Sequence, residues 1–216
     1  EGTVPNINLA REIAEQQKLD YVFAVEWDRR LNADEGGEHG LSILSKYPIG
    51  NASLIRHTPC YDHFNEKGHY GGRATLAVDL ALGDRRVRVY DAHYATRDVD
   101  GTCRAMQGDE VLADAHLAEQ PAVQLLGGDF NTFICTPLLA LCNDPSYAEP
   151  VVRNLQLDGW TDMLPTFTSW TQLGIGLVQQ RLDWLFTKGV SPVSFEVRQD
   201  ILVVDHVPVM ADLSLF

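Results

Sequence analysis

Basic residues are scarce in this chain. Its 216 residues contain 17 lysines and arginines against 30 aspartates and glutamates, which gives a formal net charge of −13. Proteins that grip a long nucleic-acid backbone usually carry a basic stripe, and the one tight basic cluster here is Arg85, Arg86 and Arg88. This cluster follows Gly83-Asp84, which is typical of a two-residue hairpin loop, so we interpret it as a solvated strand face. The composition therefore argues against tight binding of duplex DNA.

Long apolar runs and repeats are also missing. No apolar run approaches the length of a transmembrane helix, and no signal peptide is visible. No internal repeat, low-complexity tract or change in composition divides the chain. With 45% hydrophobic content, a chain of this length can bury one substantial core. We therefore expect a single domain over residues 1–216.

Cysteine is present only at Cys60, Cys103, Cys135 and Cys142. The even count permits disulfides, and a bond between Cys135 and Cys142 would close a short loop. Free thiols packed as small hydrophobic side chains fit the sequence equally well. The spacing C-x-x-C is absent, which argues against binding of a soft metal ion.

The most informative segment is Gly127-Gly128-Asp129-Phe130-Asn131, which follows a short apolar run. If the chain stays extended, Asp129 and Asn131 project from one side and Phe130 turns the other way into the core. A carboxylate can accept a proton or hold a cation, and a carboxamide can donate to a phosphate or a water. An ordinary turn would also explain the segment, because Asp and Asn often end strands through local hydrogen bonds.

Two further acids lie beside or within apolar segments. An ionised Asp183 would be costly there unless it faces outward or has a partner such as Arg181 or Lys188. Asp205-His206 separates two hydrophobic segments, and the alternation of apolar residues after it indicates a strand. This pair too could be an ordinary turn.

His93 stands where another predicted strand runs out into polar sequence. A lone histidine at a strand end is more often a hydrogen-bonded surface residue than a catalyst. Taken together, however, four strand ends supply three carboxylates, one amide and two imidazoles. Few structural roles require that set, whereas metal-assisted hydrolysis of a phosphoester requires most of it.

The order of these motifs resembles the endonuclease/exonuclease/phosphatase superfamily. That superfamily includes pancreatic-type deoxyribonucleases, abasic-site endonucleases, inositol polyphosphate phosphatases and bacterial sphingomyelinases. The resemblance covers nearly the whole chain and is carried by His93-Tyr94, Gly128-Asp129-Phe130-Asn131, Arg181-Leu182-Asp183-Trp184, Asp205-His206, the segment G-L-S-I-L-S-K-Y-P-I from Gly40 to Ile49, and Arg104-x-x-Gln107.

One feature of the family is not matched. Its members normally open with a strand carrying an Asn, followed by a strand ending in Gln-Glu, whose Glu holds the metal. Neither motif is recognisable before Gly40, so we expect a chain that is N-terminally incomplete or has lost part of its metal site. Glu1 is one candidate for the metal ligand, at the edge of the chain. Glu26 is a more remote substitute for that ligand, and it is expected to face solvent, opposite Val25 and Trp27.

The resemblance implies a divalent cation and an activated water. Mg²⁺, with Mn²⁺ as a substitute, is expected because both bind carboxylate and phosphate oxygens. Asp205 and Asp129 are the predicted metal ligands. Asp129 would also orient or deprotonate the attacking water, and Asn131 would position that water or the scissile phosphate.

The resemblance further implies roles for the imidazoles. His206 would donate a hydrogen bond to a phosphate oxygen, and Asp183 would fix its tautomer and favour the charged ring. His93 would be a second donor to the charge that grows in the transition state.

Periodicity and turn residues predict the fold that the family resemblance implies. This is an α/β sandwich of two packed, mostly antiparallel sheets with outer helices, N-terminally incomplete. Helices are predicted over about 9–19 and 103–118, and strands over 22–27, 41–45, 51–55, 74–82, 86–92, 123–127, 182–187 and 207–215.

The acidic composition favours a small phosphoester, a lipid headgroup or a nucleotide as substrate over duplex DNA, although bound cations invert the local field. Two alternatives stay open. The chain could be a non-catalytic or truncated family member that acts as a binding domain, or a nuclease acting on DNA or RNA. An incomplete sheet would expose an edge, so we also expect a homo-oligomer that covers it.

Overall fold

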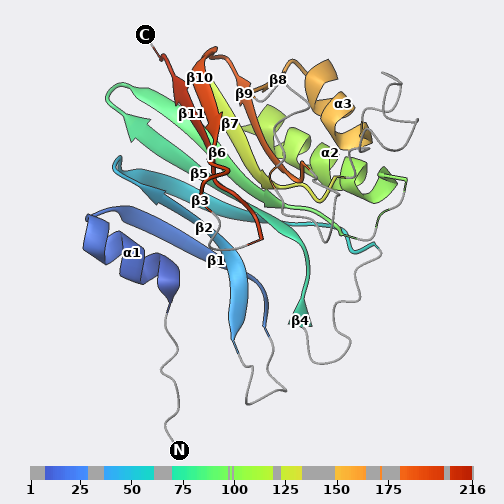
Figure 1. Ribbon diagram of the computed structural model, residues 1–216, viewed down its shortest axis with the longest axis horizontal. Helices are drawn as coiled ribbons and strands as arrows, with labels where there is room; N and C mark the ends of the chain where they lie inside the picture. The colour runs from blue at the N-terminus through green and yellow to red at the C-terminus, as the bar shows by residue number, and fades with distance from the viewer. Residues whose placement is uncertain are drawn as a thin grey trace, which may run out of the picture.

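The computed structural model describes residues 8–28, 37–60, 70–96, 98, 100–118, 123–132, 149–163, 171, 181–201 and 205–215, which form three sheets and three helices (Figure 1). In chain order the elements are α1 (Leu9–Gln17), β1 (Asp20–Asp28), β2 (Glu38–Ser45), β3 (Ile49–Arg56), β4 (Tyr70–Gly71), β5 (Ala74–Leu82), β6 (Arg85–His93), α2 (Thr102–Leu117), β7 (Val123–Asp129), α3 (Pro150–Leu157), β8 (Thr161–Asp162), β9 (Asp183–Lys188), β10 (Pro192–Val197) and β11 (Val209–Leu213).

The largest sheet has the strand order β3-β5-β6-β7-β9-β8. Its ladders are antiparallel except for the parallel pair β6 and β7. A parallel pair needs a crossover connection, and α2 lies in the connection between these two strands. The smaller sheets have the orders β2-β1-β4 and β10-β11.

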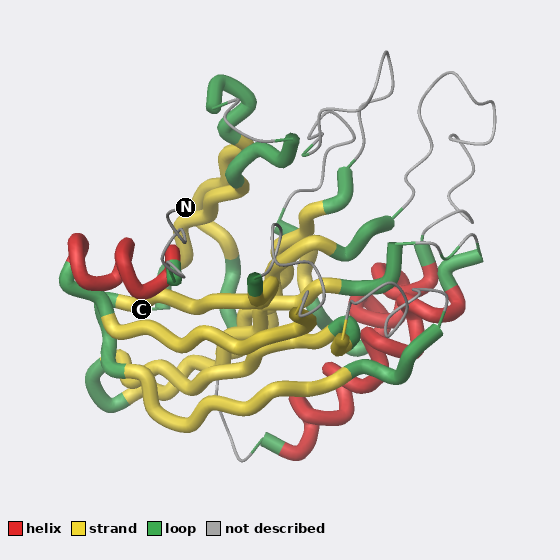
Figure 2. The backbone as a smooth tube through the Cα atoms, turned by 90° about the horizontal axis from the view of Figure 1, so that it is seen from below, coloured by secondary structure: helices red, strands yellow, loops and turns green. Residues whose placement is uncertain are grey.

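The core has two parts, one on each face of the large sheet. On one face, Tyr90, Leu126 and Phe186 pack with residues of α2 and α3, which cover that face (Figure 1). On the other face, Leu76 of β5 packs with Leu41 of β2 and its neighbours in the three-stranded sheet. Figure 2 shows the strands running side by side, with the helices at the periphery of the strand layers. The predicted α/β sandwich is confirmed.

Most predicted elements are present with shifted ends. β5 spans the predicted residues, and the predicted Gly83-Asp84 loop joins it to β6, with Leu82 paired to Arg85. Gly83 has φ +67°, a conformation that favours glycine. The sequence prediction missed α3 and the strands β4, β8 and β10. β4 and β8 are two residues long, and β10 has no buried face to give an alternating pattern. None of the described helices is long and apolar enough to cross a membrane.

Arg88 corrects the prediction of a solvated basic strand face. Arg85 and Arg86 are exposed, but Arg88 is only 7% exposed. Its guanidinium contacts Asp79 at 3.0 Å and Asp114 of α2 at 2.7 Å. Because α2 covers this face of the sheet, a charged side chain there needs partners of opposite charge. The buried Asp79 and the partly exposed Asp114 supply them.

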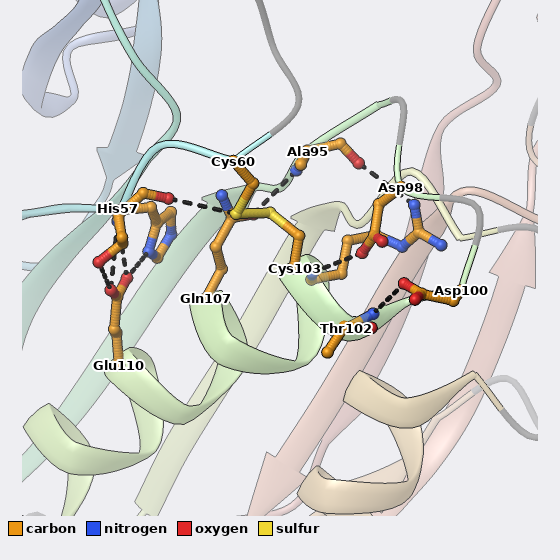
Figure 3. The surroundings of a disulfide bond; sticks show 11 residues. His57, Cys60, Ala95, Asp98, Asp100, Thr102, Cys103, Gln107 and Glu110 are labelled. Atoms are coloured by element: carbon orange, nitrogen blue, oxygen red, sulfur yellow. Dashed lines mark hydrogen bonds and ion pairs between the residues drawn. A yellow bond between two sulfur atoms is a disulfide. The ribbon is translucent and has the colours of Figure 1, made fainter.

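A disulfide between Cys60 and Cys103 ties the segment after β3 to the first turn of α2 (Figure 3). It resolves the choice between thiols and disulfides for these two cysteines. Cys135 and Cys142 lie outside the described residues, so the choice between a bond and free thiols stays open for them.

Hydrogen bonds reinforce the same attachment of α2. The Glu110 side chain accepts from the Thr58 backbone N–H and contacts Nδ1 of the buried His57 at 2.7 Å (Figure 3). One turn earlier, Gln107 Oε1 accepts the N–H of Ala95 at 2.9 Å. Because Ala95 follows His93 by two residues, α2 fixes the chain directly after a predicted site residue.

Candidate active site

The ends of β6, β7 and β9 bring three predicted site residues into one row. The parallel ladder pairs His93 with Asp129, and the antiparallel ladder pairs Asp129 with Asp183. Directly paired residues point to the same face of a sheet, and His93 Nε2 lies 3.8 Å from Asp129 Oδ2. The central carboxylate therefore has an imidazole on one side and a second carboxylate on the other.

His206 joins this row from the segment just before β11. Its Nδ1 lies 2.7 Å from Asp183 Oδ2. This hydrogen bond raises the pKa of the ring to about 9, against the opposing effect of burial, and the charges of Asp183, Asp129 and Asp205 add to the rise. At neutral pH the ring is therefore charged, and both of its nitrogens are donors.

Thr171 holds the Asp183 strand and the His206 segment together. Its Oγ1 accepts the backbone N–H groups of Leu182 at 3.0 Å and Asp183 at 2.9 Å. Its carbonyl oxygen accepts the N–H of Val207 at 2.8 Å. This buried threonine was not predicted as a site residue, because no motif in the sequence marks it.

Gly128 brings β7 close to β6. Its φ is +134°, and a Cβ at this position would collide with the backbone carbonyl of Ala92. A side chain here would push apart the strands that carry His93 and Asp129. The close approach of β6 and β7 thus explains why the second residue of the Gly127-Gly128 pair is a glycine.

Asp129 is the last residue of β7, and the chain leaves the extended conformation directly after it. Asn131 has φ +50°, and its N–H donates to Asp129 Oδ1 at 2.9 Å. Its side-chain amide donates to the Tyr94 carbonyl at 2.9 Å. The chain is therefore not extended at Asn131, which was the condition for Asp129 and Asn131 to project from the same side. Phe130 is fully buried, as expected.

The surroundings of Asp129 make it a stronger base than an exposed aspartate. Burial raises the pKa of its carboxyl group, and the negative charge of Asp183 acts in the same direction. The charges of His93 and His206 and the N–H of Asn131 oppose the rise without cancelling it. A carboxylate with a raised pKa is better matched to accepting a proton from water near neutral pH.

The prediction that Glu26 faces solvent is wrong. Its side chain is buried, and the residue is only 1% exposed. Both faces of β1 carry apolar residues, and the inward face proves to be that of Val22 and Ala24, which pack against the core between the sheets. Glu26 follows Ala24 by two residues and shares this inward face. The register with β2 also shifts between Val25 and Trp27, so Glu26 lies at a bulge.

Glu26 reaches the row of side chains from the opposite sheet. Its Oε2 lies 2.9 Å from His93 Nδ1 and 3.3 Å from His39 Nδ1, while its Oε1 accepts the N–H of Ala74 at 3.2 Å. Burial alone would raise the pKa of Glu26, but the hydrogen bonds with His39 and His93 and the charges of His93 and Arg73 outweigh it and lower the pKa. The carboxylate is therefore ionised.

Glu26, His39 and His93 each offer a ligand atom, and these atoms all lie within 4.8 Å of one another. Arg73 adjoins the group, with Nη1 lying against the His93 ring and the guanidinium 5.1 Å from the centre of the Trp27 ring. Neither His39 nor Arg73 was predicted as a site residue. No local pattern marks them, because the group comes from three strands and a loop.

The predicted metal ligands are less well grouped. Asp205 is exposed and lies near enough to His206 to influence the pKa of that ring, but it is not a member of the group of Glu26, His39 and His93. Glu1 lies outside the described residues. Of the predicted residues, the structure thus brings together His93, Asp129, Asp183 and His206. Asn131 lies in the turn after Asp129 and donates its N–H to that carboxylate.

The sequence profile of the endonuclease/exonuclease/phosphatase family matches residues 5–204. The chain belongs to this family. The family generally acts on phosphoester bonds by hydrolysis and generally uses divalent metal ions. A search of curated proteins gives no match.

Solved structures with the same fold are distant in sequence. The human Nocturnin catalytic domain with bound sulfate anion has a TM-score of 0.71 at 15% identity, over 96% of this chain and 76% of that one. An endonuclease/exonuclease/phosphatase from Beutenbergia cavernae DSM 12333 has a TM-score of 0.71 at 18% identity, over 99% of this chain and 59% of that one. TDP2 of D. rerio complexed with single strand DNA product has a TM-score of 0.64 at 14% identity, over 96% and 82%.

Proposed function

We propose that this chain is a divalent-metal-dependent hydrolase that cleaves a phosphoester bond with an activated water. The observation that carries the proposal is the row of His93, Asp129 and Asp183, extended by His206 at one end and by the buried Glu26 at the other. Two sheets and the segment before β11 contribute to it. Such a set of carboxylates and imidazoles fits phosphoryl chemistry better than it fits a purely structural role.

The donor atoms fit a divalent cation such as Mg²⁺ or Mn²⁺. Glu26 presents an ionised, buried carboxylate oxygen beside two imidazole nitrogens, and ligating side chains of this kind are usually oriented by a second hydrogen bond. The Ala74 N–H supplies that bond. Glu26 would hold the ion, with Asp129 and Asp205 as further proposed ligands. When bound, the ion would polarise the phosphoryl group and offset its negative charge.

Asp129 would act as the base for the attacking water. Its raised pKa favours proton transfer, and its Oδ1 is oriented by the Asn131 N–H. Asn131 would position the water or the scissile phosphate from the turn that follows. Because its amide nitrogen already donates to the Tyr94 carbonyl, its amide oxygen is the atom we assign to this role.

The imidazoles would stabilise the developing negative charge. His206 is a charged donor whose Nδ1 is committed to Asp183, which leaves Nε2 for a phosphate oxygen. His93 would be the second donor, on the opposite side of Asp129. Preorganised donors of this type act most strongly where water is excluded, and three of the four side chains in the row are less than one quarter exposed.

The substrate we propose is a small phosphoester, a lipid headgroup or a nucleotide. The net charge of −13 repels a long polyanion, and Arg88, the inner member of the one basic cluster, is buried in ion pairs. Single strand DNA product is bound by the related TDP2 structure, so a nuclease is the alternative. Cleavage of single-stranded DNA at a rate that falls steeply with added salt would favour the nuclease.

Turnover of a generic phosphodiester, with and without a divalent cation, tests the proposal. Asp129→Asn and His206→Gln should each lower the metal-dependent rate by about a hundredfold or more. His116→Gln is the matched control, because His116 is exposed on α2 and pairs with Asp158 at the end of α3. Unchanged rates in both site variants would contradict the assignment. Metal binding without turnover in the wild type would indicate a binding domain instead.

We also propose self-association through a sheet edge. In the described part of the chain, β11 is paired only with β10, and this two-stranded sheet exposes Val193 and Phe195. Apolar residues on an open edge favour pairing with another copy. Size-exclusion chromatography of the wild type and of Phe195→Lys should show a dimer that the variant loses. A monomer at high protein concentration would contradict the proposal.

A further inference from the structure

His39 stands out in the site because the catalytic roles proposed above do not use it. It lies in β2, next to the bulge in β1, and its register partner is Trp27. The imidazole stacks on the Trp27 ring with a centroid distance of 3.9 Å and an interplanar angle of 7°. The sheet therefore fixes the ring, although its side chain is 53% exposed. Its Nδ1 points at the buried carboxylate of Glu26, 3.3 Å away.

The same carboxylate oxygen faces a second imidazole. Glu26 Oε2 is 2.9 Å from His93 Nδ1, while Oε1 is held by the Ala74 N–H. Three potential ligand atoms thus converge within 4.8 Å, one from a carboxylate and two from imidazoles. Two histidines with one glutamate, and further positions left for water and substrate, form a donor set that binds transition ions in catalytic sites.

The local charge opposes any cation that is held by electrostatic attraction alone. Mg²⁺ prefers oxygen ligands and keeps much of its water, so it depends mainly on anionic charge for binding. Here the buried carboxylate has the Arg73 guanidinium as a neighbour, and that charge contributes to the lowered pKa of Glu26. Imidazole nitrogens, in contrast, form stronger bonds with Mn²⁺ or Zn²⁺ than with Mg²⁺.

We propose that Glu26, His39 and His93 form a three-ligand site that takes a first-row transition ion, Mn²⁺ or Zn²⁺, in preference to Mg²⁺. The role of the ion in hydrolysis rests on the proposed function, whereas its binding does not. Cysteine spacing in the sequence argued against a soft-metal site, and this one is built without cysteine. His39 is the ligand that sets the choice of metal.

Calorimetric titration of the metal-free chain with Mn²⁺, Zn²⁺ and Mg²⁺ tests the site, supported by metal content after dialysis. The wild type should bind Mn²⁺ and Zn²⁺ more tightly than Mg²⁺. His39→Ala should weaken Mn²⁺ and Zn²⁺ by about tenfold to a hundredfold or more, since even outer partners of metal ligands carry effects of that size. The Mg²⁺ affinity of this variant should stay near that of the wild type.

Two further variants make the result specific. Glu26→Gln should lose binding of all three ions, and His116→Ala, which removes an exposed imidazole elsewhere, should lose none. Circular dichroism of each metal-free variant checks that it folds, and the exposure of His39 makes its removal tolerable. Equal Zn²⁺ affinity in the wild type and His39→Ala would overturn the proposal. So would Mg²⁺ binding as tight as Mn²⁺ binding.

Activity separates this proposal from the proposed function. Tight Zn²⁺ or Mn²⁺ binding that depends on His39, without phosphodiester turnover, would support the metal site and contradict the hydrolase. Turnover with Mn²⁺ or Zn²⁺ that is unaffected by His39→Ala would support the hydrolase and contradict the metal site.

Discussion

The hydrogen bond between His206 and Asp183 predicts a specific dependence of stability on pH. In metal-free buffer the pKa of His206 is raised from 6.5 to about 9 in the folded protein. The folded state therefore binds this proton more tightly than the unfolded chain does. The resulting stabilisation is fully present below pH 6.5 and is lost as the pH rises through about 9.

The size of the effect follows from the two pKa values. At ~1.36 kcal/mol per pKa unit, the difference corresponds to at most about 3 kcal/mol in the free energy of unfolding. The side chains of His206 and Asp183 are 28% and 21% exposed, and solvent screens part of the interaction. We therefore expect a loss of between about 1 and 3 kcal/mol between pH 6.5 and pH 9.5.

Urea unfolding of the wild type and Asp183→Asn at several pH values measures the effect. The asparagine keeps the shape of the side chain but removes the charge, so the pH-dependent loss should largely disappear. Asp200→Asn is the control, because Asp200 forms an exposed pair with Arg198, which stays charged over this range. A titration midpoint near 6.5 for the His206 ring, measured by NMR in the wild type, would refute the reasoning. So would an equal pH dependence in Asp183→Asn.

Three other predictions concern the supports of the site. Cys60→Ser should lower the free energy of unfolding by about 4 kcal/mol, because the disulfide closes a loop with a sequence separation of 43. In urea unfolding the reduced wild type should match the variant, and an unchanged midpoint would contradict this value. Arg88→Met should cost about 3 kcal/mol by removing the guanidinium from the buried Asp79 and the partly exposed Asp114. Thermal unfolding that does not shift would show that the ion pairs contribute little. Gly128→Ala should lower the rate of turnover by more than the loss of folded protein explains, since its Cβ would collide with Ala92 and separate His93 from Asp129. A loss of turnover that only follows the loss of folded protein would contradict this.

The row of site residues could be predicted because its signals are local. Asp129 and Asp183 each sit at the end of a short apolar segment, and the ladders between neighbouring strands place them side by side. His93 follows the same rule on β6. β5 was predicted with its full length because its larger apolar residues alternate along the sequence, but the single buried face that this alternation indicated is wrong, since both faces of β5 are buried.

Glu26 could not be placed from the sequence because β1 carries apolar residues on both faces. Periodicity then identifies a strand without saying which face points inward. The inward face is decided by β2 and β5, which pack against Val22 and Ala24. The same limit applies to Arg88, whose burial depends on Asp114 from α2.

Contacts between distant segments were likewise hidden. Thr171 links the start of β9 to the segment before β11 through its side chain and its carbonyl, and no sequence pattern marks such a residue. The Cys60–Cys103 bond was one of several pairings that the cysteine count allowed. Where the prediction failed, the missing information was tertiary.

Diffraction from crystals grown with Mn²⁺ and inorganic phosphate would test most directly whether these side chains share one cation and one phosphoryl group. The anomalous signal of manganese should appear at the Glu26 carboxylate, with phosphate within hydrogen-bonding distance of the His206 ring. Manganese bound elsewhere, or phosphate remote from both His206 and Asp129, would contradict a common site.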